Sequence, residues 1–330
     1  MEYRVLGRTN LRVSALGFGC GNVGGLMVRG TGAERERAVA RALELGVNFF
    51  DTAPAYGDGV SEEHLGETLE TLRAQCLVAT KVRLGAEGLA DPARAVTRSL
   101  ETSLRRLRRE RVDLLQLHDP VRAIRAAGEP GVGEVLEGIL PAFEVLRRAG
   151  KVGFVGMTAL GDTPAVHRIL ASRAVDTAQV CFNLLNPSAG FAVPPGFPGQ
   201  DFDRLLTRTR AQRMGVVVIR VLAAGALSGD LTRHPVAVPA VDPIASGPDY
   251  ATDVGRARAL RVLVDEGHAG SLVEAALRFP LGSDAVSTVL LGYSSLEHLE
   301  AAAAAVAKGP LSPDALARLE VCWNDMASGR

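Results

Sequence analysis

At 330 residues, the chain has room for one large domain or two ordinary ones. Hydrophobic residues make up 47% of it and charged residues 22%, a composition typical of a soluble globular protein with an ample core. Basic and acidic residues number 37 each, so no net charge attracts nucleic acid or an anionic membrane.

The four cysteines lie far apart in the sequence and lack the spacing of metal ligands. We therefore expect buried free thiols in a reducing compartment and no metal site. The first residues contain no signal-peptide core, and no apolar run is long enough to cross a membrane. These features predict a cytoplasmic protein.

The chain begins with two short apolar segments, at 3–6 and 11–13, that predict a β-hairpin. Strands and helices then alternate without a break. Strands are expected at 15–19, 47–51, 76–81, 112–117, 151–157, 177–182, 215–221 and 286–291. Helices are expected at 33–45, 61–72, 91–109, 134–148, 163–171, 201–213, 253–266, 271–279, 296–307 and 313–326.

Eight strand–helix units in a row predict a parallel sheet, and in a chain of this size they favour a closed barrel. We expect an α/β fold, a (β/α)8 TIM barrel with an N-terminal β-hairpin cap at its base and extra C-terminal helices. No linker-like segment divides the chain, so residues 1–330 are expected to form a single domain. A doubly wound sheet would call for a G-x-G-x-x-G motif after the first strand, which the segment 17–21 does not contain.

The segment 47–59 starts as an apolar run of strand length and ends in turn residues. A proline and two glycines in its second half prevent a strand or a helix from continuing. Asp51 is therefore expected at the carboxyl end of a buried strand, with Tyr56 on the loop beyond it. Ser61 is expected as the N-cap of the next helix.

Two further strands end in residues that can hold or transfer a proton. Lys81 ends the strand at 76–81, and His118 follows the strand at 112–117. Because all strands of a barrel end at one mouth, these two residues should meet Asp51 and Tyr56 there.

These four residue types can act together in proton transfer. A phenol with a pKa of about 10 releases its proton poorly near neutrality, and a nearby ammonium lowers that pKa. A carboxylate keeps the ammonium charged and oriented, while a histidine can donate to a substrate oxygen. Each residue also has a structural alternative, as a turn aspartate, a loop-anchoring tyrosine, a snorkelling lysine or a rim histidine. The site would have no catalytic role only if all four structural alternatives were true at once, at neighbouring strand ends.

These motifs resemble those of the aldo-keto reductase family, whose (β/α)8 barrel binds NADP(H) without a Rossmann domain. Residues 46–57, with Ser61 and Glu62, are similar to the family's first signature, and 79–82 and 115–118 to the next two. The resemblance covers essentially the whole chain. It implies a catalytic tetrad of Asp51, Tyr56, Lys81 and His118, with Tyr56 as general acid, Lys81 and Asp51 tuning it, and His118 orienting the carbonyl.

Phosphates in TIM-type barrels bind after the seventh and eighth strands. Small residues and glycines after the seventh strand let backbone amides approach a pyrophosphate. These segments resemble the family's pyrophosphate loop and adenosine-phosphate site, and two further positions match those that hold the nicotinamide carboxamide. The resemblance implies cofactor contacts at Thr158, Gln179, Ile219, Arg220, Leu222, Gly225, Leu227, Gly292, Ser294, Ser295 and His298. Helix capping by the two serines and backbone satisfaction of the Gln179 amide are the structural alternatives.

The chain departs from the family pattern at several of these positions. Thr158-Ala159 stands where the family commonly has Ser-Asn, Ile219 where an aromatic often stacks on the nicotinamide, and Ala301-Ala302 where a Glu-Asn pair contacts adenine. No arginine or lysine occupies 292–295, so no clamp for a 2′-phosphate is evident. We expect NADP(H) as the cofactor, with NAD(H) as the alternative.

The implied reaction is reversible hydride transfer between nicotinamide and a carbonyl or alcohol, with an aldehyde, ketone or sugar as substrate. Phe18 and Met27 are expected to join Tyr56 and His118 in binding it. A nicotinamide-binding regulatory subunit of an ion-channel complex is the alternative function, because barrels of this family also serve in that role. No obligate protein partner, nucleic acid or membrane is expected.

Overall fold

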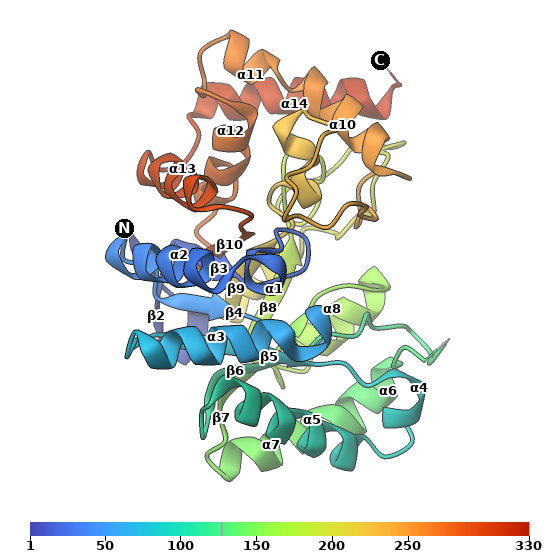
Figure 1. Ribbon diagram of the computed structural model, residues 1–330. Helices are drawn as coiled ribbons and strands as arrows, with labels where there is room; N and C mark the ends of the chain where they lie inside the picture. The colour runs from blue at the N-terminus through green and yellow to red at the C-terminus, as the bar shows by residue number, and fades with distance from the viewer. Residues whose placement is uncertain (127, 330) are drawn as a thin grey trace.

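The computed structural model describes residues 1–126 and 128–329. Eight parallel strands close into a barrel in the order β10-β3-β4-β5-β6-β7-β8-β9, and helices surround it (Figure 1). The barrel strands are β3 (Leu16–Gly19), β4 (Phe49–Asp51), β5 (Leu77–Val82), β6 (Val112–Leu117), β7 (Val152–Thr158), β8 (Thr177–Cys181), β9 (Gly215–Ile219) and β10 (Thr288–Gly292). The predicted (β/α)8 barrel is confirmed.

The α-helices are α1 (Leu26–Arg29), α2 (Gly32–Glu44), α3 (Val60–Thr71), α4 (Gly85–Gly88), α5 (Pro92–Leu107), α6 (Val132–Glu134), α7 (Leu140–Arg148), α8 (Thr163–Ala171), α9 (Leu205–Ala211), α10 (Tyr250–Ala259), α11 (Val262–Asp265), α12 (Leu272–Arg278), α13 (Leu296–Ala307) and α14 (Pro313–Ala327). Helices α2, α3, α5 and α7 pack one against the next around the strands (Figure 1). Among the described residues, no helix combines the length and the apolar character needed to span a membrane.

The predicted hairpin, β1 (Tyr3–Val5) and β2 (Arg12–Ser14), closes the base of the barrel. Leu6, in its connection, is fully buried in the cluster that fills the lower barrel. The next residue, Gly7, has a φ of +52°, and a Cβ there would lie 2.1 Å from the backbone nitrogen of Gly215. Only glycine permits this close approach of the hairpin to β9.

Strand alternation separates two cores. One face of each strand points into the barrel, where Phe49, Ala79, Leu114 and Val217 pack with Leu6. The opposite faces pack against the surrounding helices in the larger cluster. Because side chains repeat every two residues along a strand, the residue two positions beyond an interior apolar side chain also points inward, at the mouth.

Several element boundaries differ from the prediction for local reasons. The helix expected over 134–148 is interrupted by a π-helix, η3 (Val135–Ile139), because Pro141 has no N–H to donate to the Glu137 carbonyl. The helix expected over 201–213 begins only at Leu205, because Asp203 and Arg204 both have left-handed backbones, with φ of 48° and 49°.

The connections between strands and helices also contain short 3-10 helices, which no apolar periodicity indicates. They are η1 (Gly7–Thr9), η2 (Gly57–Gly59), η4 (Ala223–Ser228) and η5 (Pro280–Gly282).

Candidate active site at the barrel mouth

The structure brings the four residues of the predicted tetrad together. Asp51 is the last residue of β4, Lys81 lies near the end of β5, His118 follows β6, and Tyr56 lies on the loop after β4. Lys81 forms a fully buried ion pair with Asp51, and its Nζ lies 3.2 Å from the Tyr56 hydroxyl. The rings of Tyr56 and His118 meet edge to face, with centroids 5.7 Å apart.

The loop that carries Tyr56 is held by its own backbone. The Tyr56 N–H donates to the Ala53 carbonyl at 3.1 Å, and the Tyr56 carbonyl accepts from the Ser61 N–H at 3.2 Å. Ser61 is not the N-cap that the sequence predicts, because α3 begins at Val60 after a left-handed Gly59. The Ser61 hydroxyl instead donates to the Cys20 carbonyl at 2.8 Å, which ties the start of α3 to the loop after β3.

The ammonium of Lys81 uses all three of its protons inside the site. One goes to Asp51 Oδ1, one to the Thr52 carbonyl at 2.8 Å, and one to the Tyr56 hydroxyl oxygen at 3.2 Å. Because the Tyr56 oxygen accepts from Lys81, its own proton is free to be donated elsewhere. The hydrogen bond therefore runs from a fixed cation, Lys81, to a phenol that can act as an acid.

Burial and charge act against each other on these groups. Burial raises the pKa of Asp51, and Lys81 with two side-chain amides pulls it back. Burial alone would lower the pKa of Lys81, but Asp51 and Tyr56 outweigh it, so the pKa is raised and the lysine stays charged. Burial also raises the pKa of Tyr56, and Lys81 offsets part of that rise, so the phenol is protonated at neutral pH.

His118 is neutral at physiological pH. Burial, together with the positive charges of Lys81 and Arg83, lowers the pKa of its imidazole to about 3. Its Nδ1 is buried and has no hydrogen-bond partner among the described residues. A neutral imidazole can still donate one hydrogen bond, so His118 can orient a substrate oxygen without carrying charge.

Thr158 and Gln179, predicted to hold the nicotinamide carboxamide, lie beside the tetrad. Both are 2% exposed. The Gln179 amide nitrogen donates to Asp51 Oδ2 at 2.7 Å, and its oxygen lies 3.4 Å from the Thr158 hydroxyl. The Gln179 amide is therefore satisfied by the Asp51 side chain, and not by the backbone as the structural alternative expected.

The predicted pyrophosphate segment follows β9. Ile219 points into the barrel, Leu227 is fully buried, and Leu222 and Gly225 flank a turn with left-handed backbone. Arg220 also has a left-handed backbone, with a φ of 55°.

The half-buried guanidinium of Arg220 makes one hydrogen bond to a carbonyl, that of Asp242 at 3.2 Å. Burial lowers its pKa. None of the ion pairs formed among the described residues includes Arg220, so it offers a cation to an anionic ligand.

The predicted adenosine-phosphate segment follows β10 and contains both expected serines. Ser295 is the N-cap of α13 and accepts from the His298 N–H at 3.4 Å. Ser294 donates instead to the Gly24 carbonyl at 2.7 Å. A Cβ on Gly24 would lie 2.5 Å from the carbonyl carbon of Gly292, so the loops after β3 and β10 are in direct contact.

The structure does not bring the two predicted apolar substrate contacts to the surface. Phe18 is fully buried, with its ring 5.2 Å from that of Phe50 and 4.9 Å from that of Tyr293. Met27 is 1% exposed. Their contact with substrate stays a prediction, and their burial in the core weighs against it.

Sequence reasoning missed Gln116. Its side-chain amide, on β6, donates to Asp51 Oδ2 at 3.0 Å. The available signal was a polar residue two positions after the interior Leu114, at the same height as Lys81 on the neighbouring strand.

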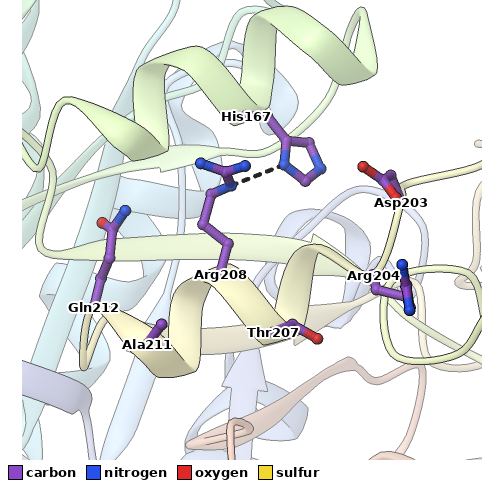
Figure 2. A pocket seen from close by; sticks show the side chains of 7 residues that line it. All are labelled: His167, Asp203, Arg204, Thr207, Arg208, Ala211 and Gln212. Carbon is purple, nitrogen blue, oxygen red and sulfur yellow. Dashed lines mark hydrogen bonds between the residues drawn. The ribbon is translucent and has the colours of Figure 1, made fainter.

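Two surface hollows of about 490 Å³ each lie away from the tetrad. Figure 2 shows the one between α8 and α9, where Arg208 Nε donates to His167 Nδ1 at 3.0 Å. His167 Nε2 lies 2.9 Å from the Phe202 carbonyl, which can only accept, so Nε2 is the donor of this ring and Nδ1 the acceptor. The other hollow lies between the N-terminus, α2 and α13. Neither includes a predicted site residue.

Comparison with known proteins identifies the family of the chain. The model of the aldo/keto reductase family matches residues 15–324. The chain is 28% identical to an L-galactose dehydrogenase of Arabidopsis thaliana, over 93% of this chain and 88% of the relative. It is 28% identical to a D-threo-aldose 1-dehydrogenase of a Pseudomonas species, over 86% of each chain.

A solved structure shares the fold. An aldo-keto reductase from Bacillus halodurans, in its holo form, superposes with a TM-score of 0.73 at 24% identity, covering 98% of this chain and 96% of that one. With a family match over nearly its whole length, the chain belongs to the aldo/keto reductase family.

Proposed function

We propose that the protein reversibly transfers a hydride between a nicotinamide cofactor and a carbonyl or alcohol carbon, with Tyr56 as the general acid and base. The observation that carries this proposal is the hydrogen bond from Lys81 to the Tyr56 oxygen, at 3.2 Å. This hydrogen bond leaves the phenol proton free. It also places a positive charge beside the oxygen that must release that proton. Membership of an oxidoreductase family supports the same reaction class.

In the reduction direction, negative charge develops on the carbonyl oxygen of the substrate, and Tyr56 donates its proton to that oxygen. Lys81 stabilises the phenolate that remains, and Asp51 keeps Lys81 charged. His118 donates a hydrogen bond to the same substrate oxygen from its neutral ring. In the oxidation direction, the phenolate accepts the proton of the alcohol. Positioned proton transfer of this kind contributes about 10²- to 10⁴-fold to a rate.

The residues present fit a nicotinamide dinucleotide. Arg220 offers a half-buried guanidinium outside the described ion pairs, and a glycine-containing turn follows it. Ser295 marks the N-terminus of a 12-residue helix, where anions bind favourably. When bound, the cofactor supplies or accepts the hydride. Arg220 would hold the pyrophosphate, Ser295 and His298 the adenosine end, and Thr158 with Gln179 the carboxamide; NADP(H) is our first choice and NAD(H) the alternative.

We infer an aldose or another hydroxylated carbonyl compound as the substrate class. The relatives named for L-galactose and D-threo-aldose oxidation support this class. We also propose that the reaction takes place in the cytoplasm and that residues 1–330 act as one domain.

The test replaces the proton donor. Tyr56→Phe should lower kcat by about 10³-fold, because only the hydroxyl is removed. Fluorescence titrations with NADPH and NADH should give dissociation constants within about twofold of wild type, and they also determine which cofactor is preferred. Turnover is measured with a panel of aldehydes, ketones and aldoses, which separates an enzyme from a regulatory subunit. A kcat within tenfold of wild type would show that Tyr56 is not the proton donor.

A further inference from the structure

The carboxylate of Asp51 is bonded on both of its oxygens. Oδ1 faces Lys81, while Oδ2 accepts from the Gln116 amide at 3.0 Å and the Gln179 amide at 2.7 Å. All four side chains are 2% exposed or less. Two neutral donors thus converge on the oxygen that the lysine does not use.

The amide of Gln116 lies in an environment that does not otherwise suit it. It is fully buried inside the barrel, and its Oε1 has no hydrogen-bond partner among the described residues. An aliphatic side chain would fill the same space without an unsatisfied oxygen. The bond from Nε2 to a charged acceptor is therefore the interaction that offsets the burial of this amide.

The two amides differ in what else they can do. Gln179 also approaches Thr158, and both belong to the proposed carboxamide site. In the part of the chain that the structure describes, the Gln116 side chain forms one hydrogen bond, to Asp51. Its backbone faces Lys81 across the ladder between β5 and β6, so the position of its side chain is set by the same strands that set the ion pair.

We propose that Gln116 is a positioning residue, which keeps Asp51 ionised and thereby keeps Lys81 protonated against the Tyr56 oxygen. This inference rests on the proposed function. A hydrogen bond to a carboxylate favours its charged form, which opposes the effect of burial. Without it, the proton that Lys81 shares with Asp51 moves toward the carboxylate. A neutral lysine stabilises the phenolate of Tyr56 less, and the phenol releases its proton at a higher pH.

The groups that face Asp51 define the expected pH response. Lys81 on β5 and Arg220 after β9 are the cations, and Tyr56 and Cys20 are the other titratable groups whose charges act on this cluster. Burial raises the pKa of the Cys20 thiol well above its ordinary value, so Cys20 stays neutral. His118, beyond β6, is neutral above a pKa of about 3. Between pH 5 and 10, the profile therefore reports on the Asp51–Lys81–Tyr56 chain.

The experiment measures kcat for alcohol oxidation as a function of pH in Gln116→Leu, Gln116→Glu and wild type. In Gln116→Leu, the pKa that limits kcat on the acidic side should rise by about one unit, because one hydrogen bond to the carboxylate is lost. In Gln116→Glu, a protonated carboxylic acid can donate to Asp51 and preserve activity at low pH. When it ionises, two carboxylates face each other, so activity should fall along a limb that wild type lacks.

Thr288→Val is the matched control, since Thr288 is a fully buried polar residue of the barrel interior whose hydroxyl also has no hydrogen-bond partner within residues 1–126 and 128–329. It should leave the pH profile unchanged. Wild-type profiles in both Gln116 variants would overturn the inference, and if the leucine variant does not fold, the glutamate variant decides alone. Tyr56→Phe in the same assay separates the two proposals: a full loss there with unshifted Gln116 profiles rejects only the role of Gln116.

Discussion

The two ends of this barrel are made by the same strands and have opposite chemistry. At the base, Leu6 from the hairpin packs on Phe49, Ala79 and Leu114, and the end is closed by apolar contacts. At the mouth, two positions further along the same strands, lie Asp51, Lys81 and Gln116, where Lys81 and Gln116 both donate to the Asp51 carboxylate. The inward-facing side chains of each strand therefore form apolar contacts at the base and a hydrogen-bonded acid–base cluster at the mouth.

The difference shows how a buried charge is tolerated. Lys81 and Asp51 are each 1% exposed, and burial opposes the charge of both. They remain ionised because every proton of the ammonium and both oxygens of the carboxylate have partners. The base needs only matching volumes, whereas the mouth needs matching donors and acceptors.

The largest effect is expected from Lys81→Met, which removes the cation from the mouth and leaves Asp51 unpaired. Activity should fall by about 10³-fold or more, because the phenolate of Tyr56 loses its stabilising charge. The free energy of unfolding should drop by about 3–5 kcal/mol, because a buried carboxylate loses its counter-ion. Steady-state kinetics and urea denaturation measure the two losses.

The double variant Asp51→Asn with Lys81→Met is the control for that prediction. It removes both charges, so it should recover much of the stability and none of the activity. Equal stability of the single and double variants would contradict the account of the ion pair.

At the opposite end, Leu6→Ala should destabilise the fold without impairing the chemistry. Loss of a fully buried side chain costs about 2–5 kcal/mol. The kcat at a temperature where the variant is folded should stay within about twofold of wild type, because the tetrad lies at the other end of the strands. A proportional fall in kcat would show that the two ends are coupled.

A third prediction concerns the pH dependence of stability and His118. Its pKa is about 3 when folded and about 6.5 when unfolded, so between these values the unfolded state binds more protons. The stability that this histidine contributes is therefore complete above pH 6.5 and is lost as the pH falls toward 3. Urea denaturation of wild type and His118→Asn at pH 7.5 and 4.5 should show a wild-type loss larger by about 3 kcal/mol. An equal loss in both proteins would refute the low pKa.

The smallest effect is expected at Ser295, on the rim of the mouth. Ser295→Ala should cost about 1 kcal/mol of stability, because the N-cap of α13 is lost. Ser295→Asp keeps a capping oxygen, so its stability should be unchanged, but its charge should weaken NADPH binding by about tenfold relative to NADH. Equal weakening of both cofactors would place the 2′-phosphate elsewhere.

Features that depend on local sequence were easier to predict than contacts between distant segments. The eight-unit alternation and the turn after Asp51 were readable because strand length, apolar patterning and glycine or proline breaks are local properties. The placement of Tyr56, Lys81 and His118 followed once the barrel was assumed, because all barrel strands end on one side. The Ser61 prediction failed because a serine near a helix start can cap it or reach a neighbouring loop, and the Cys20 carbonyl lies 41 residues away in sequence.

Local sequence determined that this chain alternates strands and helices, and that an aspartate, a tyrosine, a lysine and a histidine stand at or beyond strand ends. Only the closed barrel decided which of them share protons, and that the amides of Gln116 and Gln179 complete the shell around Asp51. The physical reason is that a hydrogen bond depends on the distance between two atoms. In this site that distance is set by the register of β4, β5, β6 and β8, which no single stretch of sequence contains.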